Sequence, residues 1–151
     1  MDQYITHYGQ MRSFNPDMVN TGRLIDELFD PASKTHEIVR RLDEDGNREI
    51  IYYQNKESGK IDGPHITTFN NTLVAFVQYK DGLKHGRAYS WYLTGQRQYE
   101  LMYMNDGRHG YYTHWNIDGD IIEITRYSNG LKDGFNIKYR DDSEEFVEIS
   151  R

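Results

Sequence analysis

The chain of 151 residues contains no cysteine and only three prolines. The absence of cysteine excludes disulfides, thiolate metal sites and a cysteine nucleophile, and it favours a reducing compartment over an extracellular one. No apolar run is long enough to span a bilayer. The first residues, Met1 to His7, have neither the basic region nor the apolar region of a secretory signal. We therefore expect a cytoplasmic protein.

Basic residues are the minority among the charges. The chain has 18 Lys and Arg against 24 Asp and Glu, a formal net charge of −6, which repels phosphate groups at long range. Nucleic acid is therefore not an expected partner, and the same charge disfavours an anionic membrane surface. Only 36% of residues are hydrophobic, yet 14% are aromatic and 13 are tyrosine. Such a tyrosine content suits a thin sheet whose faces are partly exposed to solvent, and it argues against disorder.

An internal repeat is the most informative feature of the chain. Three segments align without gaps, each running from a tyrosine to a glycine, and equivalent positions lie 24 residues apart. Another aromatic residue follows each of these glycines by five positions. Degenerate earlier copies run through Gly59–Gly63 and from Asp45 onward. The repeat-defining residues, to which we assign structural roles, are Tyr79, Gly86, Trp91, Tyr103, Gly110, Trp115, Tyr127, Gly134 and Tyr139.

The spacing of turn signals predicts the fold class. Asp-Gly and Asn-Gly pairs favour the positive φ angles of tight hairpin turns, and segments of strand length separate them. We therefore predict a mainly β fold with a short N-terminal helix. Residues 36–151 would form an extended, single-layer, solenoid-like antiparallel meander of hairpin repeats about 24 residues long.

Alternation along the predicted strands assigns residues to faces. Tyr89 and Trp91 should share one face; Tyr99, Leu101 and Tyr103 should share a face of the next strand; and Leu73, Ala75, Val77 and Tyr79 follow the same pattern. One copy breaks the pattern, because Ile122 and Ile124 have the opposite parity to Glu123 and Thr125. Either that strand packs on its other face, or a bulge shifts it.

Residues 1–35 differ from the repeats and are predicted to cap the sheet, with a helix near residues 16–29. Asn15 can serve as its N-cap with Pro16 in the first turn, although Gly22 leaves open a later start at Thr21. Apolar residues then recur at helical spacing as far as Phe29.

The Tyr-x-x-Gly-x-x-x-Gly core with its following aromatic resembles MORN repeats. The 24-residue spacing and the Asn-Gly-Leu-Lys-Asp-Gly form are similar to the bacterial variant in YwqK-like antitoxin proteins. The resemblance covers about two thirds of the chain, from Arg48 onward. It implies a repeat sheet, and it implies attachment or scaffolding rather than chemistry.

Candidate catalytic and metal-binding residues are interpreted as structural. Equivalent turn positions hold Asp62, His85, His109 and Asp133, but hairpins repeat at about 10 Å, too far apart for one zinc ion. The carboxylate pairs fall in predicted turns or near the C-terminus, where solvated surface is the better interpretation. These pairs lie at Asp43, Glu44 and Asp45, at Asp141 and Asp142, and at Glu144 and Glu145. We expect no enzyme activity, no metal site and no cofactor.

A single-layer sheet cannot bury both of its faces, so curvature, the N-terminal helix, a second copy of the chain or a partner must cover the second one. The candidate binding surface consists of Tyr89, Tyr92, Tyr111, Tyr112, Phe135 and Ile137. Aromatic residues are enriched in protein interfaces, which points to a protein partner or to self-association.

Three functions fit these observations. The first is a non-catalytic protein–protein interaction or scaffolding module. The second is an antitoxin or immunity protein that neutralises a partner toxin. The third is attachment to a phospholipid surface, for which Lys80, Lys84, Arg108 and Lys132 would have to line one turn edge.

Overall fold

The computed structural model describes residues 2–8, 10–14, 20–139 and 146–150. Two small elements open the chain, a two-stranded hairpin of β1 (Asp2–Ile5) and β2 (Met11–Phe14), and helix α1 (Thr21–Leu28). Within the described residues, ten strands form the main sheet. They are β3 (His36–Leu42), β4 (Arg48–Asn55), β5 (Ile61–Phe69), β6 (Thr72–Lys80), β7 (Leu83–Trp91), β8 (Arg97–Met104), β9 (Gly107–Trp115), β10 (Ile121–Ser128), β11 (Leu131–Tyr139) and β12 (Phe146–Ser150).

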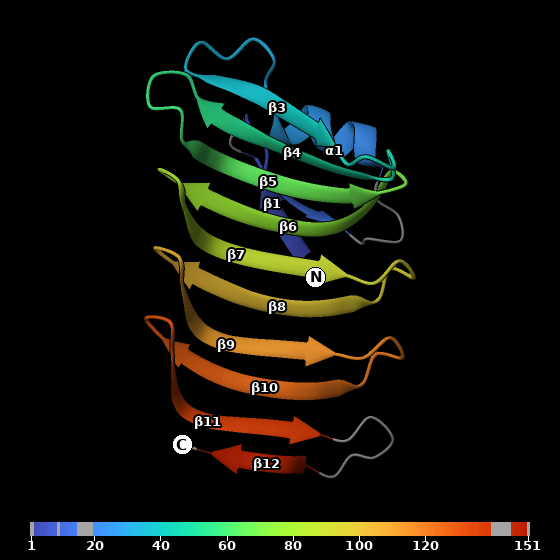
Figure 1. Cartoon of the computed structure of the whole chain (residues 1–151), viewed down its shortest axis with the longest axis vertical. Helices are drawn as coiled ribbons and strands as arrows, with labels where there is room; N and C mark the ends of the chain where they lie inside the picture. The colour runs from blue at the N-terminus through green and yellow to red at the C-terminus, as the bar shows by residue number, and fades with distance from the viewer. Residues whose placement is uncertain (1, 9, 15–19, 140–145, 151) are drawn as a thin grey trace.

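The main sheet is an open antiparallel meander. Its strands lie side by side in chain order from β3 to β12, and Figure 1 shows them one below another. Consecutive strands pair antiparallel throughout. The predicted fold class, a mainly β hairpin meander with one short helix, is confirmed.

The hairpin turns have the backbone that their sequences demand. In the β6–β7 turn, Asp81 and Gly82 both have positive φ angles, +50° and +86°. Asp106 takes the equivalent glycine position in the β8–β9 turn at φ +72°. Positive φ at both central residues gives the turn whose twist matches that of the flanking strands.

The repeat glycines mark bulges rather than turns. Gly86, Gly110 and Gly134 have φ angles of +105°, +78° and +99°. Each lies where the pairing with the preceding strand shifts register. Because L-residues rarely adopt such φ angles, these positions require glycine, and the bulges increase the local twist of the strands.

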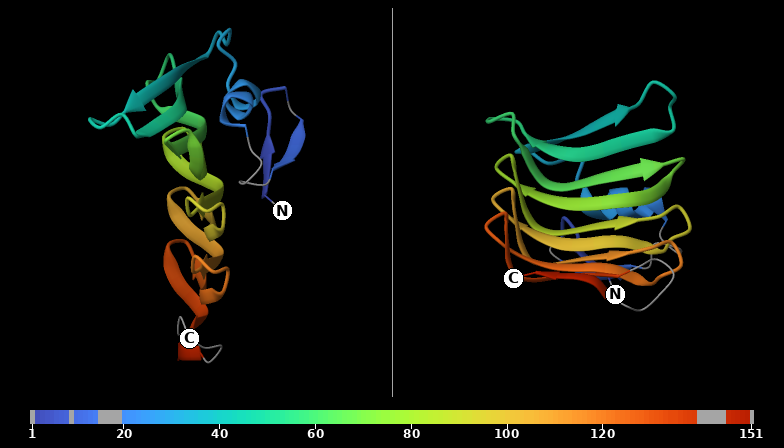
Figure 2. Two further views of the ribbon diagram at one scale, coloured as in Figure 1. Left: turned by 90° about the vertical axis from the view of Figure 1, so that its right-hand side faces the viewer. Right: turned by 60° about the horizontal axis from the view of Figure 1, so that its bottom comes forward.

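The N-terminal segment packs against one face of the sheet. We call this the helix face; its core contains Ile51, Ile66, Phe76, Tyr89 and Trp91, in contact with Tyr4, Leu24, Leu28 and Phe29. Figure 2 shows β1, β2 and α1 beside the upper strands of the sheet, whereas the lower strands extend beyond them. The segment predicted to be a cap therefore covers part of a face.

Helix α1 begins at Thr21, the later of the two predicted starts. Asn20 is the N-cap, and its side-chain oxygen accepts a hydrogen bond from the Arg23 amide at 3.0 Å. The proposed cap at Asn15 and first turn at Pro16 lie outside the described residues. Phe29 is the C-cap, and its ring packs edge-on against Tyr53 with 4.9 Å between ring centroids. The β1–β2 hairpin was not predicted, since its four-residue strands carry no repeat signal.

The strand register shows which face Glu123 and Thr125 occupy in the irregular repeat copy. Glu123 and Thr125 pair with His114 and Tyr112, so they keep the face that the repeat assigns to them. The pairing of β10 with β9 shifts between Ile121 and Glu123. A second shift, between Thr67 and Thr68, sends Leu73 into the core of the helix face. The prediction that Leu73 shares a face with Ala75 is therefore wrong, because a bulge lies between them.

Candidate binding surface

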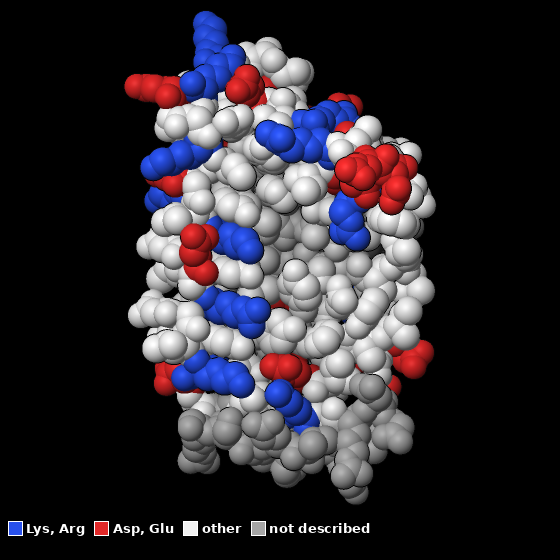
Figure 3. All heavy atoms as spheres, in the orientation of Figure 1, with Lys and Arg blue, Asp and Glu red and all other residues white. Residues whose placement is uncertain are grey.

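The second face of the sheet, the open face, is the side away from α1 and β1–β2. Residues that pair across strands share a face, and one such row runs Thr67, Ala75, Ser90, Tyr99 and His114. Figure 3 views the molecule from this side and shows it hollowed between the two columns of turns. Within the described residues, no helix covers this side in the two views of Figure 2.

A hollow of about 420 Å³ lies in the upper half of the open face. Small side chains form its floor, because Thr67, Ala75 and Ser90 occupy neighbouring positions on three adjacent strands. Tyr99 and Tyr92 line its wall, and the Tyr92 hydroxyl is fixed by donating to the Trp115 carbonyl at 2.8 Å. The hollow can accept an apolar or aromatic side chain of a ligand.

Along the turn edge of the same face, tyrosines alternate with cations. Tyr79 pairs with Lys84, Tyr103 with Arg108, and Tyr127 with Lys132, across strands β6 to β11. We call Lys84, Arg108 and Lys132 the basic column; Figure 3 shows basic groups stacked along this side of the molecule.

Aromatic rings hold two members of the basic column in place. The Lys84 ammonium lies 5.0 Å from the centroid of Tyr103. The Arg108 guanidinium lies 5.4 Å from the centroid of Tyr112 and 5.3 Å from that of Tyr127. Such cation–π contacts fix the charges on the open face without neutralising them.

A polar cluster occupies the lower half of the open face. The Thr125 hydroxyl donates to Glu123 Oε2 at 2.7 Å and lies 2.6 Å from Asn136 Oδ1. Thr125 and Asn136 are both buried, and the Asn136 amide nitrogen has no hydrogen-bond partner within the described structure. Burial, and then the nearby Glu123 carboxylate, raise the pKa of Tyr112 to about 12. This tyrosine therefore stays a neutral hydrogen-bonding group.

Of the turn column Asp62, His85, His109 and Asp133, the first two link successive hairpins, whereas His109 Nδ1 is buried without a hydrogen-bond partner in the described structure. Asp62 Oδ1 accepts the Asp81 amide at 2.9 Å, and His85 Nδ1 accepts the Asn105 amide at 3.4 Å. Both side chains thus bind the first residue of the next turn. Among the residues that the structure describes, no three His, Asp or Glu side chains gather closely enough to hold a metal ion.

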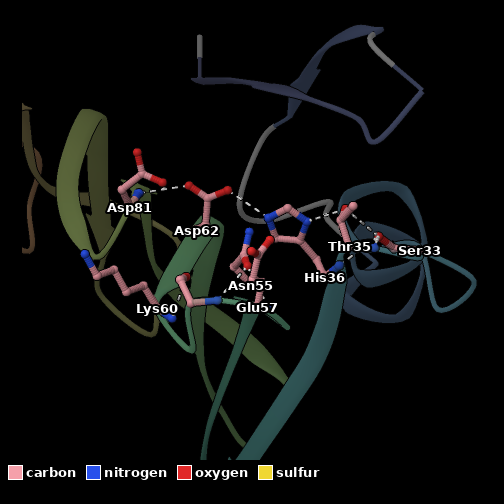
Figure 4. A network of polar contacts seen from close by, with 9 residues as sticks. Ser33, Thr35, His36, Asn55, Glu57, Lys60, Asp62 and Asp81 are labelled. Atoms are coloured by element: carbon pink, nitrogen blue, oxygen red, sulfur yellow. Dashed lines mark hydrogen bonds and ion pairs between the residues drawn. The ribbon is translucent and has the colours of Figure 1, made fainter.

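Asp62 also anchors the start of the sheet (Figure 4). Its Oδ2 lies 2.8 Å from His36 Nε2, and His36 Nδ1 lies 2.8 Å from the Thr35 hydroxyl. Burial alone would raise the pKa of Asp62, but the Asp81 amide and His36 together lower it below its ordinary value. This arrangement brings a hydroxyl, an imidazole and a carboxylate together. Its contacts tie β3 to β5 and to the β6–β7 turn, which is a structural role.

The described side chains of the predicted binding surface do not lie together. Tyr92 and Tyr112 belong to the open face, whereas Tyr89, Tyr111 and Ile137 lie on the helix face. Tyr89 is 4% exposed and belongs to the core, so it is not a surface residue. Tyr111 is 54% exposed, and the side chain of Phe135 lies outside the described part of the structure.

Other sequence-predicted groups also separate. Lys80 pairs with Leu83 on the side opposite to Tyr79, so only three of the four predicted turn-edge cations share a face. Asp43, Glu44 and Asp45 lie exposed around the β3–β4 turn, and the acids at positions 141–145 lie outside the described residues.

The sequence interpretation overlooked Thr67, Ala75, Ser90 and Tyr99 as residues of the open face. The signal for Thr67, Ala75 and Ser90 was their small size at positions that pair across strands, and this signal can be used only when the register is known.

Comparisons with known proteins add no assignment. No helix in the described residues is long and apolar enough to cross a membrane. No family model matches the chain, and neither a curated protein nor a solved structure matches it.

Proposed function

We propose that the chain is a non-catalytic, MORN-like binding module that takes up a segment of a protein partner on its open face. One observation carries this proposal. The open face combines a hollow beside Tyr99 with cations that aromatic rings hold in position. The chain's own N-terminal segment already occupies the upper part of the helix face.

The chemistry of the open face suits a protein ligand. Tyrosine offers a large contact area with little conformational freedom to lose, and it can form hydrogen bonds at its tip. Among the described residues, the tyrosines on this face include Tyr79, Tyr99, Tyr103, Tyr112 and Tyr127, at intervals set by the strands. Small floor residues next to tyrosines provide a pocket for an anchoring side chain of the partner.

A phospholipid surface is the second candidate, and the basic column favours it. Two features count against it. The column is one residue wide and lies beside the carboxylates of Asp106 and Glu123. The face is also hollowed, so a flat bilayer would touch its rims and leave the tyrosines uncovered. We therefore favour a protein ligand.

Neighbouring tyrosines on opposite faces provide a matched test. Tyr112 points to the open face and Tyr111 to the helix face of the same strand. Each can be replaced in turn by the photo-reactive residue benzoylphenylalanine, in cells that carry the native gene. We expect a discrete cross-linked protein from position 112 and none from position 111. Cross-links from position 111 alone, or lipid adducts from position 112, would refute the proposal.

A further inference from the structure

The basic column repeats at the spacing of the hairpins. Lys84, Arg108 and Lys132 lie on β7, β9 and β11, each paired with the tyrosine of the preceding strand. Alternate strands of a sheet are about 9.4–9.8 Å apart. A ligand that crosses the strands along the column therefore meets a cation at each such interval.

The three cations form no ion pair with the acidic side chains that the structure describes. Other arginines are neutralised: Arg40 pairs with Glu49 at 2.8 Å and Arg97 with Glu100 at 2.7 Å. Within the described residues, no carboxylate forms an ion pair with Lys84, Arg108 or Lys132. The Asp106 and Glu123 carboxylates lie nearby but form no ion pair with these cations, so negative charge of a ligand would be complementary to the column.

Backbone geometry selects the kind of ligand. A polyproline-type extended chain rises about 3.1 Å per residue with three residues per turn, so every third residue returns to one side after about 9.3 Å. That distance matches the spacing of the cations. An α-helix needs seven residues and about 10.5 Å for the same return, so it falls out of register along the column. Tyr103 and Tyr127, between the cations, offer the aromatic surfaces that proline-rich extended chains contact.

We propose that the open face binds an extended acidic protein segment with Asp or Glu at every third residue. Three successive acidic side chains pair with Lys84, Arg108 and Lys132, and the residues between them pack on Tyr103 and Tyr127. This inference rests on the proposed function and adds to it the chemical class and the periodicity of the ligand.

The probe is a fluorescein-labelled peptide of Glu-Pro-Ala repeats, about four repeats long, titrated with the whole chain and followed by fluorescence anisotropy. A control peptide of the same composition has its glutamates in one block. We expect the spaced peptide to bind at least about tenfold more tightly than the block peptide. The advantage should shrink as salt rises, because screening shortens the range of charge interactions.

Matched variants assign the contact. Lys84→Gln/Arg108→Gln/Lys132→Gln should weaken binding of the spaced peptide at least about tenfold. Lys34→Gln/Lys80→Gln/Arg126→Gln makes the same charge change away from the column and should leave binding unchanged. Lys84→Arg/Lys132→Arg keeps both charges and should retain binding, which separates lost contacts from lost folding. Circular dichroism confirms that each variant is folded.

Two results would overturn the inference: equal binding of the spaced and block peptides, or unchanged binding by the first triple variant. Phosphatidylserine vesicles that bind through the same three cations, without binding of the spaced peptide, would reassign the column to lipid. The spaced peptide could fail to bind while position 112 still cross-links to a protein. In that case the proposed spacing of acidic residues in the ligand is wrong, and the proposed protein-binding function stands.

Discussion

The Arg108 guanidinium lies over the ring of Tyr127, 5.3 Å from its centroid, and donates a hydrogen bond to its hydroxyl at 3.1 Å. This contact joins the second strand of one repeat to the first strand of the next. The double-mutant cycle of Arg108→Gln and Tyr127→Leu should give a coupling free energy of about 0.5–1 kcal/mol in urea unfolding. A coupling near zero would mean that the column is not held by its rings.

Successive hairpins are in close contact at Gly107, a glycine whose φ angle is not in the positive region. A Cβ on Gly107 would lie 3.1 Å from the backbone carbon of Asn129 and from the backbone nitrogen of Gly130. Gly107→Ala should therefore lower the free energy of unfolding by about 1–3 kcal/mol, because backbone atoms have little room to move. Gly22→Ala, in α1, is the control, since the nearest atom there is 3.4 Å away and alanine favours the helix. Equal effects at the two positions would contradict close packing between turns.

His65 should make stability depend on pH. It lies on the open face between Tyr52 and Tyr79, with ring centroids at 5.5 and 5.4 Å. Burial, and to a lesser degree the Lys84 ammonium, lower its pKa below the ordinary value. Below about pH 6.5 the unfolded chain takes up a proton that the folded chain resists. The free energy of unfolding therefore decreases as the pH is lowered.

His65→Gln should flatten this dependence between about pH 7 and pH 5.5. Urea unfolding at a series of pH values measures it. A slope that His65→Gln leaves unchanged would show that this histidine does not cause it.

The buried pair of Thr125 and Asn136 predicts a non-additive result. Thr125→Val removes a hydroxyl that serves both Asn136 and Glu123, and it should cost about 1–3 kcal/mol because the amide stays buried without it. Thr125→Val/Asn136→Leu should cost less than the sum of the two single changes, since no orphaned polar group remains. Additive losses in thermal or urea unfolding would rule out this coupling.

The repeats made the fold predictable. Turn pairs such as Asp81 and Gly82 are residue types that favour the positive φ angles of a hairpin turn. The 24-residue period then places every strand from β6 onward. The β1–β2 hairpin has no such pattern, and its place against the sheet depends on contacts of Tyr4 with distant residues. Local propensity contains no information on such contacts.

The faces were harder to predict than the strands. Alternation alone places Leu73 with Ala75, but the bulge between them reverses the face of Leu73. Tyr111 and Tyr112 look equivalent in the sequence, yet only Tyr112 shares the open face with Tyr99. Repeat glycines signal a bulge, but which neighbours it moves to the other face depends on the pairing.

The claim that a partner binds on the open face can be tested most directly with fluorine NMR. The chain is labelled with 3-fluorotyrosine and titrated with the protein that position 112 cross-links. We predict that the resonances of Tyr99, Tyr103, Tyr112 and Tyr127 shift, while those of Tyr8 and Tyr111, exposed elsewhere, stay in place. Shifts confined to Tyr8 and Tyr111, with the open-face tyrosines unmoved, would contradict it.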